Sequence, residues 1–183
     1  MRPIFTIHAG EFIVGEYIEK HFRDLNVWIP SKDTGVDLLV TRKDNTSRSV
    51  SLQVKLSRDY KPSLASSDFD KQMIAGGWLS LSHKKIEEST AEFWVFVLVS
   101  HERKIDPQYI VIPPYDLLQK LVKIHGKSKN YHFYPWVLNS KVALQGRGLS
   151  KEDKQLIADD NYELKDRDLS CYLSNWKPLI DLV

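Results

Sequence analysis

An acidic residue, an amide and a lysine in the first third of the chain have the chemistry of a cation site. Asp37 lies in an otherwise apolar run, where a carboxylate is costly unless a partner compensates its charge. Gln53 and Lys55 alternate with apolar residues, so both point to one face of a strand. If 36–41 and 50–56 pair as a hairpin, the three side chains meet around one point. Carboxylate and amide oxygens there would bind a hard cation beside an ammonium group.

A glutamate near the start of the first predicted helix offers a third oxygen. Apolar residues recur at i, i+4 and i+8 through 13–25, which predicts an amphipathic helix. At about 100° per residue, Glu11 falls within the apolar stripe, whereas Glu16 and Glu19 fall outside it. Such a glutamate either binds a metal or stabilises the helix N-terminus or pairs with an arginine. Its coincidence with Asp37 favours a metal ligand.

The rest of the chain predicts further strands and helices around these residues. Residues 93–99 are apolar at every position, which predicts a central strand covered on both faces. The C-terminal segment from residue 168 predicts a docked helix, whose apolar residues include Leu169 and Trp176. The remaining predicted elements are strands at 27–30 and 109–112, a polar hairpin turn at 43–47, and a helix at 114–124 that proline opens and Gly126 closes.

Positive charge gathers in one stretch of a chain whose net charge is only +2. Residues 117–151 carry seven lysines and arginines and no acidic residue, which indicates a surface for an anionic polymer such as nucleic acid. The aromatic residues of 131–137 would then stack on bases, or they form a strand whose rings belong to the core. Trp78 we expect to pack, with Lys84 and Lys85 beside it at the surface.

Composition bounds the class of protein. The 183 residues, 42% of them hydrophobic, suffice for one packed core. The single cysteine, Cys171, excludes an intramolecular disulfide and a cysteine-based zinc site. Without an apolar run of signal or membrane-spanning length, we expect a cytoplasmic protein with no membrane partner. Walker A, His-Glu-x-x-His, Gly-x-Ser-x-Gly and Gly-x-Gly-x-x-Gly motifs are absent, which argues against NTP-driven and serine-hydrolase chemistry.

The series Gly10-Glu11, Gly35-Val36-Asp37 and Gln53-Val54-Lys55 resembles the PD-(D/E)XK, or restriction-endonuclease-like, nuclease superfamily in its Gln-x-Lys, Mrr-like variant. The likeness covers residues 8 to 60 with specificity and extends loosely to 109–113. It implies an α/β fold, with a three-layer core in which helices flank a mixed central sheet. Residues 1–145 would form this nuclease domain, and 146–183 a helical extension packed on it.

The resemblance implies a Mg²⁺-dependent DNA endonuclease of restriction, defence or repair type, with Mn²⁺ as a substitute metal. Glu11, Asp37 and Gln53 would be metal ligands, Gln53 replacing the usual second carboxylate, and Lys55 the motif lysine. The alternative is a nuclease fold without turnover that binds DNA or a protein. A homodimer would serve cleavage of both strands. The predicted DNA-binding residues are Lys84, Lys85, Lys123, Lys127, Lys129 and Arg147.

Overall fold

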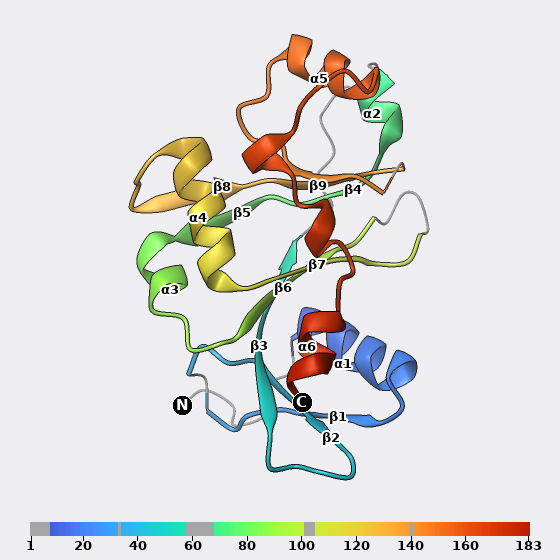
Figure 1. The fold of residues 1–183 in the computed structure, drawn as a ribbon, viewed down its shortest axis with the longest axis vertical. Helices are drawn as coiled ribbons and strands as arrows, with labels where there is room; N and C mark the ends of the chain where they lie inside the picture. Colours follow the sequence, from blue (N-terminus) through green and yellow to red (C-terminus); the bar gives the residue numbers. More distant parts are fainter. Residues whose placement is uncertain (1–7, 33, 58–67, 101–104, 140) are drawn as a thin grey trace.

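A mixed sheet of five strands forms the centre of the molecule in the computed structural model, which describes residues 8–32, 34–57, 68–100, 105–139 and 141–183 (Figure 1). The strand order is β1-β2-β3-β6-β7; β3 and β6 are parallel, and the other neighbours are antiparallel. The predicted α/β class and mixed central sheet are therefore confirmed. The strands are β1 (Leu25–Trp28), β2 (Leu38–Arg42), β3 (Ser49–Ser57), β6 (Phe93–Leu98) and β7 (Gln108–Ile112).

Strand β6 confirms the prediction of a strand covered on both faces. It lies between β3 and β7, and all six of its side chains are buried. Its alternate residues belong to two separate hydrophobic clusters, with Val95 in one and Phe96 in the other. An apolar run without alternation is what a strand between two covering layers requires.

Helices cover both faces of this sheet. On one face, α1 (Ala9–His21) and α6 (Lys177–Leu182) pack through residues such as Val14 and Leu179. On the other face lie α3 (His83–Glu87), α4 (Pro114–His125) and a two-stranded ribbon of β5 (Leu79–Ser82) and β8 (Asn130–Phe133). Figure 1 shows α1 and α6 side by side, with α3, α4 and the ribbon on the other side of β6.

A third apolar cluster lies beyond this ribbon. The antiparallel sheet β10-β9-β4 packs against α2 (Asp68–Gln72) and α5 (Lys151–Ala158), and Phe69, Trp136 and Ile157 are buried between them. The strands are β4 (Met73–Gly76), β9 (Pro135–Leu138) and β10 (Ala143–Gln145). Among the described residues, no helix is long and apolar enough to cross a membrane.

The first helix and the following strand are offset from their predicted positions. Helix α1 ends at His21, and Leu25 begins β1, so the helix predicted through residue 25 is too long. Leu25 follows the i, i+4 spacing of the apolar residues of α1, although it belongs to β1. It is fully buried as a strand residue, and its backbone N–H donates to the carbonyl of Phe22 in the turn between the two elements.

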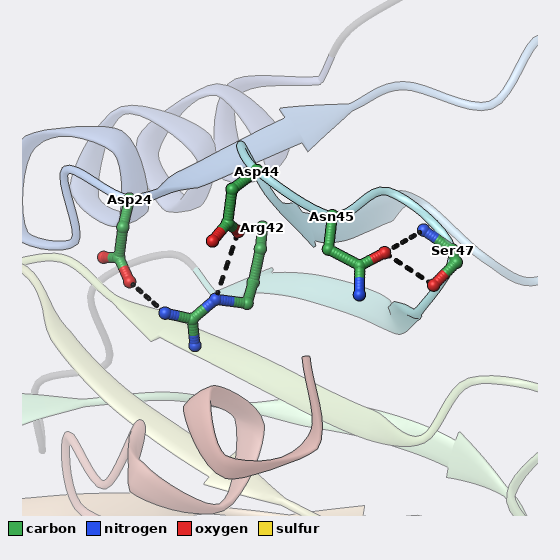
Figure 2. Close-up of polar contacts among 5 residues, drawn as sticks. All are labelled: Asp24, Arg42, Asp44, Asn45 and Ser47. Carbon is green, nitrogen blue, oxygen red and sulfur yellow. Dashed lines mark hydrogen bonds and ion pairs between the residues drawn. The ribbon is translucent and has the colours of Figure 1, made fainter.

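The predicted hairpin turn between β2 and β3 is confirmed, and Figure 2 shows its polar contacts. Asn45 Oδ1 accepts from the backbone N–H of Ser47 at 3.0 Å and from its hydroxyl at 2.6 Å, as in an Asx-turn. Arg42 at the end of β2 lies 3.1 Å from Asp24 and 3.5 Å from Asp44. These contacts lie at the end of the hairpin remote from Asp37.

The tail is less helical than predicted. From residue 168 on, the chain makes one short 3₁₀ turn, η2 (Ser170–Tyr172), and only α6 is α-helical; another 3₁₀ turn, η1 (Lys165–Arg167), precedes this segment. Leu173 pairs with Ile110 of β7 as an isolated bridge. The predicted docking residues Leu169 and Trp176 are buried, but in different clusters on opposite faces of the sheet. An extended segment between residues 169 and 176 can reach both clusters, whereas a single helix would place both side chains on one face of the sheet.

Candidate functional site

Asp37 leaves the β2–β3 ladder and binds β3 through its side chain. The ladder ends at the pair Leu38–Leu52, after which the Asp37 N–H still donates to the Leu52 carbonyl at 2.8 Å. The next N–H of β3 along this edge, that of Val54, does not bind a backbone carbonyl of β2. Asp37 Oδ2 accepts from the Val54 N–H at 2.6 Å, a short charge-assisted hydrogen bond. Asp37 therefore precedes β2, and the prediction that it lies within strand 36–41 is wrong at this end, because the carboxylate replaces the backbone partner.

Gln53 and Lys55 point to the same face of β3, as predicted from the alternation. Val50, Leu52 and Val54 are buried, while Ser51, Gln53 and Lys55 are half-buried. The alternation fails at the end of the strand, where Leu56 is 42% exposed and Ser57 is buried. Asp37 binds the backbone on both sides of Gln53, through the Leu52 carbonyl and the Val54 N–H. The structure thus brings Asp37, Gln53 and Lys55 to one end of the hairpin.

A surface pocket of about 230 Å³ lies where Gln53 and Lys55 point. Trp94 of β6 forms one wall, and the Lys55 ammonium lies 5.6 Å from the centre of its ring. A cation at this distance from an indole is attracted by the ring. Lys85 of α3 also lines the pocket, and none of the described residues that line it is acidic. The pocket is therefore positive, with both lysines at its wall.

The start of α1, next to Glu11, packs on the same end of β3 from the other face of the sheet. Gly10 packs so closely on β3 that an added Cβ would lie 2.9 Å from Leu56 Cβ and 3.5 Å from the Leu56 backbone nitrogen. Asp37 binds the nitrogen of Val54, two residues earlier, or about 7 Å along the strand. The start of α1 and the Asp37 carboxylate therefore both contact β3 beyond the point where β2 has ended.

Glu11 also has the helix-capping role that was weighed as the alternative. Its Oε2 accepts from the His8 N–H at 3.0 Å, across the first turn of α1. The residue is only 8% exposed, and the described part of the chain gives it no ion pair. A buried carboxylate without a counter-charge is unusual. The predicted phase of the helix is confirmed, because Glu16 and Glu19 are exposed.

The donor atoms of Asp37, Glu11 and Gln53 are of the type that a hard cation prefers. Within the described ranges, Asp37 Oδ1 and Glu11 Oε1 make no hydrogen bond, so each carboxylate has one oxygen that could bind a cation. The helix that carries Glu11 packs on the Val54 face of β3, whereas Gln53 and Lys55 line the pocket on the opposite face. Oxygen ligands of this kind suit Mg²⁺ or Mn²⁺. Over the same ranges, no three His, Cys, Asp or Glu side chains gather as a metal centre. A metal here would thus depend on the amide of Gln53 or on water for its third ligand.

Trp78 lies at the surface, so the prediction that it packs is wrong. It is 53% exposed and lines the pocket opposite Lys55. Its position follows from Gly77, where an added Cβ would lie 2.8 Å from Leu98 and 3.0 Å from Ser57. This close approach lets the Trp78 N–H donate to Ser57 Oγ at 2.8 Å. The Gly76-Gly77 pair was the signal in the sequence for such an approach.

The predicted nucleic-acid cations divide into two groups. Lys84, Lys85, Lys127 and Lys129 are exposed on or next to α3, since Ser82 pairs with Asn130 and the Lys129 carbonyl accepts from the His83 N–H. Lys84 also contacts Glu88 at 3.8 Å. Lys123 of α4 lies 3.4 Å from Asp166, which neutralises it. Arg147 stacks on Tyr134.

The aromatic residues of 131–137 are mainly core. Tyr131, Phe133 and Trp136 are at most 3% exposed, which decides between the two interpretations of this segment. Tyr134 is the exception: it is half-buried, and its hydroxyl accepts from Trp78 Nε1 at 3.0 Å and from Arg147 at 3.3 Å. One ring of the four therefore lies at the surface.

No family model, curated protein or solved structure matches this chain significantly. The functional interpretation therefore depends on the residues and geometry of the chain itself.

Proposed function

We propose that the protein is a Mg²⁺-dependent endonuclease that hydrolyses phosphodiester bonds of DNA. The observation that carries the proposal is the position of Asp37, whose carboxylate lies outside the ladder on Val54, with Gln53 and Lys55 on the adjoining pocket face. A strand pairing of ordinary geometry would place a backbone carbonyl there. Glu11 is buried without an ion partner in the described chain, and its neighbour Gly10 packs on the same strand.

Each side chain has a distinct part in this reaction. Asp37, Glu11 and Gln53 would hold the cation, and a bound cation would supply positive charge to offset the charge of the phosphate. Lys55 lies 5.6 Å from the Trp94 ring, a contact that stabilises a charged ammonium group. Lys55 therefore orients water and offsets the developing negative charge, which a cation does without releasing a proton. Lys85 attracts the phosphate backbone to the pocket.

A nuclease fold that binds DNA without cutting it is the second candidate. Gln53 favours it, because the site has one carboxylate fewer than the resembled family, and the described residues form no cluster of three acidic or histidine ligands. The two candidates differ in what Gln53→Glu does. In an enzyme, the added carboxylate lowers the Mg²⁺ concentration needed for cleavage. In a binding module, it only adds a negative charge that weakens DNA binding.

Nicking of supercoiled plasmid in Mg²⁺ or Mn²⁺ tests the proposal. We expect wild-type protein to nick, EDTA to abolish the activity, and Lys55→Ala to lower the rate by about 100-fold or more. Lys43→Ala, an exposed lysine in the β2–β3 hairpin, is the matched control and should keep full activity. Equal nicking by wild type and Lys55→Ala would reveal a contaminating nuclease and refute the proposal. Salt-sensitive DNA binding without nicking would establish the second candidate.

A further inference from the structure

The wall of the pocket carries an exposed tryptophan in a fixed orientation. The Trp78 N–H donates to Ser57 Oγ at 2.8 Å, and its indole Nε1 donates to Tyr134 Oη at 3.0 Å. Its ring is nearly parallel to that of His132, with 12° between the planes and 6.4 Å between the centres. Despite these contacts, 53% of the residue is exposed. A rigid indole face in solvent is costly, and such faces serve as stacking platforms.

Cations surround this platform. Lys55 and Lys85 line the same pocket, and Arg147 donates to Tyr134 Oη at 3.3 Å, with its guanidinium 5.6 Å from the centre of the Tyr134 ring. Tyr134 thus joins Trp78 and Arg147 through one hydroxyl group. Aromatic faces alternating with positive charges match a polynucleotide strand, in which bases alternate with phosphates.

The size of the pocket limits what part of a strand it can take. About 230 Å³ is less than the roughly 300–1,000 Å³ of pockets for drug-sized ligands, so it suits one base with its phosphate rather than a longer segment. Within a duplex, both faces of a base are covered by neighbouring bases. Only an unpaired or flipped base can stack on Trp78.

The geometry points to an unpaired nucleotide as the ligand of this pocket, with its base on Trp78 and its phosphate between Lys55 and Lys85. The substrate class is therefore single-stranded DNA, or duplex DNA with an unpaired base at the cleavage position. This inference rests on the proposed function, since Lys55 belongs to both. It adds to that function the preference for an exposed base.

Fluorescence anisotropy of a labelled oligothymidylate, measured in EDTA, tests the inference without any cleavage. Wild-type protein should bind the strand more tightly than a blunt duplex of the same length. Trp78→Ala and Trp78→Leu should weaken strand binding about tenfold, because a single stacked base contributes this much or more. Trp78→Phe, which keeps a ring, should weaken it by less than about threefold.

Trp28 provides the matched control. It is 50% exposed on β1, and its Nε1 donates to Thr41 Oγ1 at 2.9 Å, so it resembles Trp78 but lies outside the pocket. Trp28→Ala should leave binding unchanged. The inference is overturned if Trp78→Ala and Trp28→Ala bind alike, if the duplex binds as tightly as the strand, or if the strand does not bind. An oligouridylate that binds more tightly than the oligothymidylate would also overturn it, because it would identify RNA as the ligand.

The two proposals fail in different ways. Binding that depends on Trp78, without any nicking that depends on Lys55, would refute the nuclease and leave the nucleotide pocket standing. Nicking that depends on Lys55 but is insensitive to Trp78→Ala would refute the nucleotide pocket alone. Thermal unfolding of each Trp78 variant shows whether weaker binding comes from lost stacking or from lost folding. The hydrogen bond to Ser57 Oγ uses only the backbone N–H of residue 78, so we expect each variant to keep it and to remain folded.

Discussion

Replacing Asp37 separates its two roles, one in the sheet and one in the site. Asp37→Ala removes the acceptor of the Val54 N–H, and Val54 is only 7% exposed, so water replaces the lost partner poorly. A buried N–H left without a partner costs about 1–3 kcal/mol. Asp37 itself is half-buried, which favours the lower part of this range, and we expect a loss of about 1.5 kcal/mol. For a chain of this length, the melting temperature should fall by about 3–6 °C.

Asp37→Asn gives the contrasting result. The amide oxygen can still accept from Val54, so the free energy of unfolding should fall by less than about 1 kcal/mol. If the proposed function is right, losing the negative charge also weakens cation binding, so nicking should fall by about 100-fold or more. The asparagine variant is thus expected to be folded and inactive, and the alanine variant both destabilised and inactive.

Urea denaturation followed by circular dichroism in EDTA measures the first effect free of bound cations, and plasmid nicking by the same preparations measures the second. Asp44→Ala is the control, because Asp44 is an exposed acidic residue of the neighbouring hairpin and should change neither quantity. An alanine variant as stable as wild type would refute the structural role of the carboxylate. An asparagine variant with full activity would refute its role in the site.

Three further predictions concern stability. Gly146→Ala places a Cβ about 2.2 Å from the buried Trp136 ring, so it should lower the free energy of unfolding, measured by urea denaturation, by about 3 kcal/mol. A loss below about 1 kcal/mol would show that the ring moves aside. Burial and nearby guanidinium groups lower the pKa of His125, whose Nε2 accepts from Gln145. The free energy of unfolding should therefore be highest above the ordinary histidine pKa of 6.5 and fall as the pH drops below it; His125→Phe should reduce this pH dependence in urea titrations. Burial raises the pKa of Tyr109 to about 12, so its contribution to stability should be complete below pH 10 and be lost between about pH 10 and 12. An absorbance titration in which every tyrosine ionises near pH 10 would contradict this.

Patterns carried by neighbouring residues were predictable from the sequence. The alternation in β3 gave the common face of Gln53 and Lys55, and the unbroken apolar run gave the central position of β6. Proline and Gly126, whose φ is +72°, set the ends of α4. These features depend on side-chain period and local backbone preference, both of which are written in short segments.

Features that depend on contacts between distant segments were not predictable. The apolar spacing around Asp37 predicts a continuous strand, but its carboxylate binds Val54 and delays the start of β2 to Leu38. Trp78 reads as a core residue by its size, and only the contact of Gly77 with Ser57 turns it to the surface. In each case, a hydrogen bond between segments decides against the local preference.

The edge of β3 that β2 leaves unpaired shows which substitutions can distinguish an enzyme from an inactive nuclease fold. Beyond Leu38, β2 no longer covers β3, and an exposed strand edge is a liability in any fold. Asp37 satisfies the N–H of Val54, and the start of α1 at Gly10 packs beside Leu56, so both help to cover this edge. A binding module would retain these residues for stability alone. Gln53 and Lys55 instead point into the pocket, where their chemistry matters to a ligand. Substitutions at Gln53 and Lys55 therefore discriminate between the two functions more sharply than any substitution along the edge.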